Sequence, residues 1–329
     1  MTIRLALIGC GYIAQASHGP ALARLASESL DIELTACCDT NLDRAEELCA
    51  EIGFRRAYTD YRHMLEAEHP DAVALLVPVH LLASLAAQIL QMGFSLLAEK
   101  PPALTVADLD ALIQSAAATR NFHMVAFNRR FAPLVTELKS LLDGQTILHV
   151  EHTFTRVQRK DPDFTTTAIH GLDTLRWLLD ADFRSLQFTY REIQDASDPV
   201  TVFGASGQFE NGAGVHLLFH PLSGAPTERT VIHTPHRTYD LRLNQGPDAP
   251  GTLAHWQDGK LIRQVDAVQV CGSDQDFILS GFYAENAAFL QAVKSGLRRS
   301  EHDFASARQS VEIMQSLRER RSNYQIQQN

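Results

Sequence analysis

Two glycines near the N-terminus and an aspartate after them have the spacing needed to hold phosphate and ribose. Gly9 and Gly11 follow the apolar run 3–8 in a Gly-x-Gly-x-x-Ala pattern that ends at Ala14. The first glycine of such a loop permits a tight turn, and the second lets backbone N–H groups approach a pyrophosphate. Asp39 closes the next apolar run, where a carboxylate can accept both hydroxyls of an adenosine ribose. The pattern predicts a dinucleotide site, with an ordinary structural turn as the alternative.

Asp39 also favours NAD over NADP. Its carboxylate would repel a 2′-phosphate, and no arginine stands directly beside it in the sequence. Arg44, about one turn into the next expected helix, is the nearest arginine that could offset this repulsion.

Lys100 is a candidate for chemistry because its neighbours restrict it. The apolar run 94–98 and Glu99 precede it, and Pro101 and Pro102 follow. Most lysines are simply solvated, which is the alternative interpretation. The Lys100–Pro101 bond is a candidate cis peptide that would aim the ammonium at the carboxyl ends of parallel strands, where ligands bind.

Thr166, His170, Asp173 and Trp177 share one face of an expected helix over 167–179. Histidine is suited to take a proton from a hydroxyl as hydride leaves the same carbon. A capped helix with locally hydrogen-bonded His170 and Asp173 is the alternative.

Asn128, Arg129 and Arg130 directly follow the expected strand 123–127. From there the arginines could orient an oxygen-rich substrate or form salt bridges. A sugar acid would suit Arg129, Arg130 and Arg156, unless these arginines pair with Asp or Glu. His152, Arg156 and the loop 160–163 are further candidates for substrate contact that one sequence cannot rank.

Two kinds of element must position these residues. Over 1–127, strands alternate with helices, which predicts a doubly wound parallel sheet of the Rossmann type. A helix is expected over 12–25, and Gly19-Pro20 inside it is expected to kink or split it. Thr40 is the expected N-cap of the next helix, and Thr105 with Asp108 should start another. Over 128–329 we expect an α+β domain with a large open, mainly antiparallel sheet and helices near 131–142, 167–179, 276–295 and 303–321. The tail from Asn323 should fray.

The composition limits the class of protein. The chain has 329 residues, 45% of them hydrophobic, and a net charge of −10, which argues against nucleic acid or an anionic membrane as partner. The five cysteines lack a C-x-x-C pair and suggest free thiols in the cytoplasm. No apolar run could span a bilayer, a strand from Ile3 leaves no room for a signal peptide, and the scattered histidines do not predict a metal site.

Four motifs together resemble the Gfo/Idh/MocA oxidoreductases, the group of glucose–fructose oxidoreductase and inositol dehydrogenase. They comprise residues 9–14, Glu99-Lys100-Pro101, residues 127–131 and Ile169-His170-Gly-Leu-Asp173 with Trp177. The penultimate helix, with Glu285 and Asn286, extends the likeness.

The resemblance implies an NAD(P)-binding domain over 1–127 and a substrate-binding and oligomerisation domain over 128–329. It implies hydride transfer between nicotinamide and a sugar, polyol or related carbinol or carbonyl, with Lys100 and His170 acting on the reacting oxygen. Substrate would be held by Asn128, Arg129, Thr166 and Asp173. Cofactor would be contacted by Gly9, Gly11, Tyr12, Ile13, Asp39, Pro78, Glu99 and Lys100. A homodimer or homotetramer would form through the sheet of the second domain.

Two departures keep other functions open. Many dehydrogenases of the family carry Asp where this chain has Thr166, and threonine cannot stabilise an imidazolium by charge. Val79 and Leu82 also replace a frequent Asn-x-x-His. A non-catalytic NAD-binding sensor and a glycoside-modifying enzyme that uses transient oxidation are the alternatives.

Overall fold

The computed structural model describes residues 2–28, 31–159, 163–195, 198–246 and 249–326, so most of the 160–163 loop lies outside the described residues. The chain forms two compact units, one of residues 1–128 and 281–308 and the other of residues 129–280 and 309–329. The first junction lies next to the expected boundary after Phe127. Residues 281–308, which were expected in the second domain, belong to the first unit.

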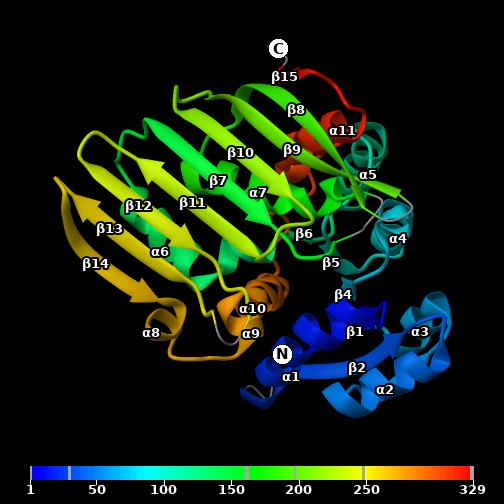
Figure 1. The fold of residues 1–329 in the computed structure, drawn as a ribbon. Coiled ribbons are helices and arrows are strands. Elements are labelled where there is room, and N and C mark those ends of the chain that lie inside the picture. The colour runs from blue at the N-terminus through cyan, green and yellow to red at the C-terminus, as the bar shows by residue number, and fades with distance from the viewer. Residues whose placement is uncertain (1, 29–30, 160–162, 196–197, 247–248, 327–329) are drawn as a thin grey trace. The chain divides into compact units, whose positions relative to one another are not determined.

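Six parallel strands form the sheet of the first unit, in the order β3-β2-β1-β4-β5-β6, as the alternating pattern predicts (Figure 1). The strands are β1 (Ile3–Ile8), β2 (Ile32–Cys38), β3 (Arg56–Tyr58), β4 (Ala72–Leu75), β5 (Ser95–Glu99) and β6 (His123–Ala126). The helices are α1 (Gly19–Glu28), α2 (Leu42–Ile52), α3 (Tyr61–Glu68), α4 (Val79–Gln91), α5 (Val106–Thr119) and α10 (Phe282–Lys294). Strand β3 and helix α3 are not part of the sequence prediction.

The second unit contains a nine-stranded sheet in the order β14-β13-β12-β11-β7-β10-β9-β8-β15 (Figure 1). Only β7 and β10 pair in parallel among its described neighbours, so the sheet is mainly antiparallel as expected. The strands are β7 (His149–Thr155), β8 (Phe183–Asp195), β9 (Asp198–Phe209), β10 (Gly214–His220), β11 (Thr227–His233), β12 (Arg237–Arg242), β13 (Thr252–Gln257), β14 (Lys260–Asp266) and β15 (Asn323–Gln325).

Helices cover one face of this sheet. Helix α6 (Pro133–Leu142) packs on β12 and β13, and α7 (Thr165–Leu179) packs on β7. The remaining helices are α8 (Ala267–Cys271), α9 (Asp276–Leu279) and α11 (Arg308–Arg318). Alternating strand residues such as Val150, Phe154 and Phe219 are buried in the core between sheet and helices.

Local chemistry explains where the elements differ from the predicted ones. Asn41, not Thr40, caps α2, because its side chain accepts the Arg44 N–H. The helix expected over 12–25 changes type at the predicted place: Ala14–His18 forms a π-helical turn (η1) before Gly19-Pro20, where Pro20 has no N–H to donate. The helix over 276–295 breaks at Gly281, whose φ is +91°. Thr105 does cap α5 by accepting the Asp108 N–H.

The expected frayed tail is wrong for its first residues. Asn323–Gln325 pair with β8, and the Tyr324 hydroxyl donates to Glu312 at 2.8 Å. Buried aromatic surface and ladder hydrogen bonds therefore order a segment that composition alone marks as polar.

Candidate functional site

The glycine loop after β1 fits a pyrophosphate. Gly9 has φ +97°, and a Cβ there would lie 2.3 Å from the Leu76 carbonyl oxygen, so both conformation and space require glycine. At Gly11 no heavy atom lies within 4 Å of the position of a Cβ. Its carbonyl accepts the N–H groups of Ala14 and Gln15, which start the helix. The backbone is thus open where a phosphate must approach closely.

Asp39 at the end of β2 is held against this loop. Its Oδ2 accepts the Cys10 N–H at 2.9 Å, and its Oδ1 accepts the Asn41 N–H at 2.9 Å. A carboxylate oxygen has further lone pairs, so the group keeps acceptor capacity for ribose hydroxyls. Because Gly9 touches Leu76, the loops after β1 and β4 are neighbours, and they carry Tyr12, Ile13 and Pro78.

A buried relay supports the end of β5. The Asn286 Nδ2 donates to the Phe282 carbonyl at 2.8 Å and lies 3.0 Å from His18 Nδ1. His18 Nε2 lies 3.2 Å from Glu99 Oε1, and Glu99 Oε2 accepts the Lys100 N–H at 2.8 Å. All of these bonds are satisfied when Nδ1 of His18 accepts and Nε2 carries the proton. The relay fixes the Glu99 carboxylate and, through it, the backbone at Lys100.

The peptide bond between Lys100 and Pro101 is cis, as the sequence suggested. Lys100 is half-buried, whereas His18 is fully buried and packs edge-on against Phe282 with ring centroids 5.0 Å apart. Sequence reasoning missed His18. Its signal was a histidine at the end of the helical turn that follows the glycine loop, directly before Gly19-Pro20.

Helix α7 is fixed by a buried ion pair. Arg130 donates from Nε to Asp173 Oδ2 at 2.8 Å and from Nη2 to Oδ1 at 2.7 Å. Side-chain exposure is 4% for the arginine and 1% for the aspartate. Asp173 therefore faces Arg130 and Ser310, not open solvent, which differs from the expected direct contact with substrate. His170 is also buried, and the Thr166 hydroxyl donates to the Asp163 carbonyl at 3.0 Å.

Arg129 and Arg156 share the buried carboxylate of Glu228. Arg129 donates from Nε to Oε1 and from Nη2 to Oε2, the latter at 2.8 Å, and Arg156 Nη2 donates to Oε2 at 2.8 Å. The salt-bridge alternative to substrate binding is thus present for both Arg129 and Arg130. Both arginines lie in the 3-10 turn η2 (Asn128–Phe131). Arg129 pairs with a residue of β11, and Arg130 pairs with a residue of α7.

Electrostatics follow from this pairing. Burial alone would raise the pKa of Glu228, but the charges and hydrogen bonds of Arg129 and Arg156 outweigh it and lower the pKa to about 2. Burial lowers the pKa of the neighbouring His152 to about 4. Its Nδ1 lies 2.9 Å from the Thr230 hydroxyl, so the ring is a neutral part of the core at pH 7.

The predicted site residues are divided between the two units. The first unit carries the cofactor-loop residues, Asp39, Pro78, Glu99, Lys100 and Asn128, and the second carries Arg129, Thr166, His170 and Asp173. Among the described residues, no group of three or more histidine, cysteine, aspartate or glutamate side chains is arranged to hold a metal ion. None of the helices in the described ranges is long and apolar enough to cross a bilayer.

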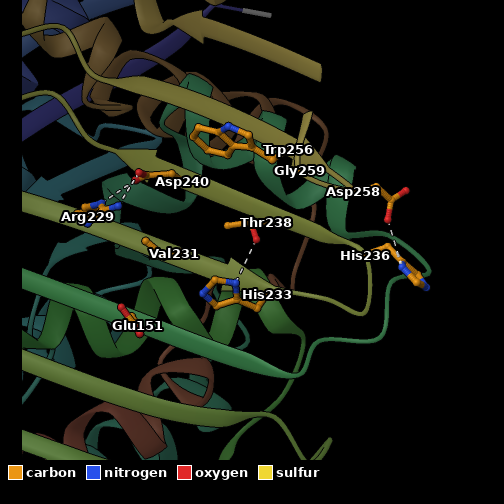
Figure 2. A pocket seen from close by; sticks show the side chains of 10 residues that line it. All are labelled: Glu151, Arg229, Val231, His233, His236, Thr238, Asp240, Trp256, Asp258 and Gly259. Carbon is orange, nitrogen blue, oxygen red and sulfur yellow. Dashed lines mark hydrogen bonds and ion pairs between the residues drawn. The ribbon is translucent and has the colours of Figure 1, made fainter. Parts of the chain in front are cut away.

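The sheet of the second unit has a hollow on its other face. Arg229 donates from Nη2 to Asp240 Oδ2 at 2.6 Å, and His233 Nδ1 lies 3.1 Å from the Thr238 hydroxyl (Figure 2). Trp256, Val231 and Glu151 complete its floor from neighbouring strands. The hollow thus places charges of both signs beside an indole.

Comparison with known proteins agrees with this geometry. The sequence profile named GFO_IDH_MocA, described as an oxidoreductase family with an NAD-binding Rossmann fold, matches residues 3–127. Residues 3–127 are thus similar to the Gfo/Idh/MocA oxidoreductases over the nucleotide-binding part of the chain. The resemblance expected from the sequence motifs is confirmed, and so is the Rossmann fold of the first unit.

Curated relatives include inositol 2-dehydrogenases. The chain is 31% identical to that of Pseudomonas savastanoi pv. phaseolicola over 207 residues, which is 58% of either protein. It is 30% identical to inositol 2-dehydrogenase 4 of Saccharopolyspora erythraea over 226 residues, 62% of this chain and 64% of the relative. The matches thus span less than two thirds of these relatives.

Solved structures share the fold along nearly the whole chain. An oxidoreductase domain protein from Kribbella flavida has a TM-score of 0.83 at 19% identity and full coverage of both chains. An Agrobacterium radiobacter oxidoreductase, solved with NAD+, L-tartaric acid and magnesium, has a TM-score of 0.79 at 17% identity over 99% of this chain and 98% of that one.

Proposed function

We propose that this chain is an NAD-dependent oxidoreductase that acts on a hydroxyl or carbonyl carbon of a sugar, polyol or related compound. The observation that carries the proposal is the open glycine loop with Asp39 beside it, in the same unit as a lysine whose backbone is fixed by a buried relay. The match of residues 3–127 to the Gfo/Idh/MocA family model and the inositol dehydrogenases among the relatives support the same class of reaction.

Lys100 and His170 act on the reacting oxygen in this proposal. The Lys100 ammonium donates a hydrogen bond to that oxygen and stabilises negative charge on it. His170 takes the hydroxyl proton on Nε2 during oxidation and returns it during reduction, since its Nδ1 is shielded from solvent. Bound nicotinamide would accept or give the hydride at the same carbon.

Other residues position the substrate and the cofactor. Arg129, Asn128 and Thr166 are proposed to hold substrate oxygens. Asp173 is proposed to act through Arg130, because its carboxylate is bonded to that guanidinium. Asp39 favours NAD over NADP for the reason of charge given above.

A second copy of the chain is the proposed protein partner. The face of the nine-stranded sheet that carries Arg229, Asp240 and Trp256 has acidic and basic groups side by side, which suits a two-fold contact of the face with itself. Light scattering should then report a dimer or tetramer.

The test is a screen of sugars, polyols and their acids with NAD and with NADP, read by the absorbance of reduced nicotinamide. Lys100→Ala and His170→Ala should each lower kcat by at least about 100-fold while NADH affinity changes little. Lys294→Ala, which removes an exposed ammonium paired with Asp31, is the control and should turn over normally.

A non-catalytic NAD sensor is the second candidate, favoured by Thr166, whose hydroxyl donates to a backbone carbonyl and cannot carry charge to His170. Tight NADH binding without turnover of any tested substrate would support it. Product formation without accumulation of NADH would instead indicate transient oxidation.

A further inference from the structure

The arginine cluster, which we define as Arg129, Arg156 and Glu228, combines two guanidinium groups with one carboxylate. Both oxygens of Glu228 accept N–H groups, Oε1 from Arg129 and Oε2 from both arginines. Arg156 therefore adds a second positive charge to an ion pair that Arg129 already forms. At pH 7 these three side chains carry a net charge of about +1, because arginine stays protonated and glutamate ionised.

The carboxylate of the cluster is buried, and the two arginine side chains are partly exposed. Side-chain exposure is 2% for Glu228, 16% for Arg129 and 18% for Arg156. The two arginine side chains are therefore more exposed than the carboxylate that they share. Burial lowers the pKa of Arg156 and Glu228 opposes this change, so a further anion would meet a partly desolvated cation.

Arg156 is also held rigidly. Its Nη1 donates to the Thr155 carbonyl at 2.9 Å, and its guanidinium lies over the Phe154 ring, 3.9 Å from the centroid. Phe154 contacts Phe164 at the start of α7, with ring centroids 6.2 Å apart. A fixed guanidinium loses little entropy when it binds a planar anion through two hydrogen bonds.

The same helix carries His170. Helix α7 rises about 1.5 Å per residue, so His170 lies roughly 9 Å along its axis from Phe164. Gly171, next to His170, packs on His152 and Phe219, so this part of α7 and the arginine cluster lie on the same face of the sheet.

We infer that the arginine cluster is a subsite for a carboxylate of the substrate, which makes a sugar acid or polyol acid the substrate class. A carboxylate is planar and can accept two parallel hydrogen bonds from one guanidinium, which suits the fixed guanidinium of Arg156. The inference rests on the proposed function for the reaction itself, and it adds the anionic group, Arg156 and Glu228 to it.

Matched substrates test the subsite. Glucuronate and gluconate are compared with glucose and glucitol, and glucose 6-phosphate serves as the phosphate probe. We expect kcat/KM at least tenfold higher for the better acid than for its neutral partner. Arg156→Gln should remove this preference mainly through KM, and Arg156→Lys should restore part of it. Arg263→Gln, which breaks an arginine–glutamate pair with Glu137 elsewhere in the second unit, should keep the preference.

A binding measurement separates this inference from the proposed function. Calorimetric titration of glucuronate into the NADH-bound protein should show binding that Arg156→Gln weakens at least tenfold and Arg263→Gln does not. Binding of this kind without turnover would overturn the proposed reaction and leave the subsite standing. The subsite would be overturned if the acids and their neutral partners were turned over with equal kcat/KM. It would also be overturned if Arg156→Gln and Arg263→Gln weakened glucuronate binding equally. Preference for the phosphate would overturn its assignment to a carboxylate.

Discussion

The two residues proposed to act on substrate are supported in different ways. Lys100 in the first unit depends on a relay of hydrogen bonds through Glu99, His18 and Asn286. His170 in the second unit lies on a helix that the Arg130–Asp173 ion pair holds in place. The relay fixes the backbone at Lys100 through hydrogen bonds. The ion pair connects helix α7 to the turn η2 through opposite charges.

The ion pair and the relay should respond differently when one of their residues is substituted. A buried ion pair that loses one partner leaves an uncompensated charge, so its removal acts first on stability. A hydrogen-bond relay that loses its middle member leaves polar groups that can partly rearrange, so its removal should act more on geometry than on folding. Substitutions in the two units can measure this contrast.

The largest effect is expected at Asp173. Asp173→Asn leaves the buried Arg130 guanidinium without its carboxylate and should lower the free energy of unfolding by about 3–5 kcal/mol. Urea denaturation followed by circular dichroism measures this change. Asp180→Asn at the end of the same helix is the control. The Asp180 side chain, which pairs with Lys139, is 79% exposed, so the loss of this pair should lower the free energy of unfolding by at most about 1 kcal/mol. Equal losses in both variants would show that burial is not the cause.

A smaller loss is expected at Glu228, whose arginine partners are partly exposed. The pKa of Glu228 is lowered to about 2 from an ordinary value near 4.3. A lowered carboxyl pKa stabilises the folded state above the ordinary value, and this contribution is lost as the pH falls toward 2. Two pKa units correspond to about 3 kcal/mol at pH 7.

Glu228→Gln should therefore be less stable than the unaltered chain at pH 7, and the gap between them should narrow between pH 4.3 and 2. Unfolding curves at pH 7, 4 and 3 test this. Glu137→Gln, which breaks a more exposed pair with Arg263, should show a small gap at pH 7 and little change with pH. A gap for Glu228→Gln that stays constant down to pH 3 would contradict the assigned charge pairing.

Local signals in the sequence predicted the fold class and pointed to several of the candidate site residues. Gly9, Asp39 and Lys100 each follow an apolar strand in the sequence. The residues next to them, such as Gly11 and Pro101, indicate the role that we propose for each. The Thr105 cap is likewise a signal within four residues. These features depend on contacts that are close in the sequence, so they can be read without coordinates.

Long-range pairs could not be predicted in this way. Arg129 and Glu228 are 99 residues apart, and Arg130 and Asp173 are 43 apart, so a single sequence offers many acids as equal partners. The return of residues 281–308 to the first unit depends on contacts such as the Val125 N–H with the His302 carbonyl. The hydrogen bond between Asn286 and His18 could not be predicted for the same reason, because the two residues are 268 positions apart in the sequence.

The smallest effect on stability is expected at His18, the middle member of the hydrogen-bond relay that supports Lys100. His18→Asn removes the contact with Glu99 because the shorter side chain cannot reach it, and should cost about 1–2 kcal/mol of unfolding free energy. The freed Glu99 carboxylate would no longer hold the Lys100 N–H in one geometry. We expect kcat to fall at least about tenfold, which corresponds to roughly 1.4 kcal/mol of transition-state stabilisation.

His18→Gln separates positioning from packing. Glutamine can place an amide N–H near the position of His18 Nε2 and so keep the bond to Glu99, although it lacks the ring that packs against Phe282. If the relay positions Lys100, the glutamine variant should recover most of kcat while its stability stays as low as that of the asparagine variant. If His18 only fills space, kcat and stability should fall together in both variants. Steady-state kinetics on the preferred substrate, with urea unfolding of the same samples, distinguishes the two cases.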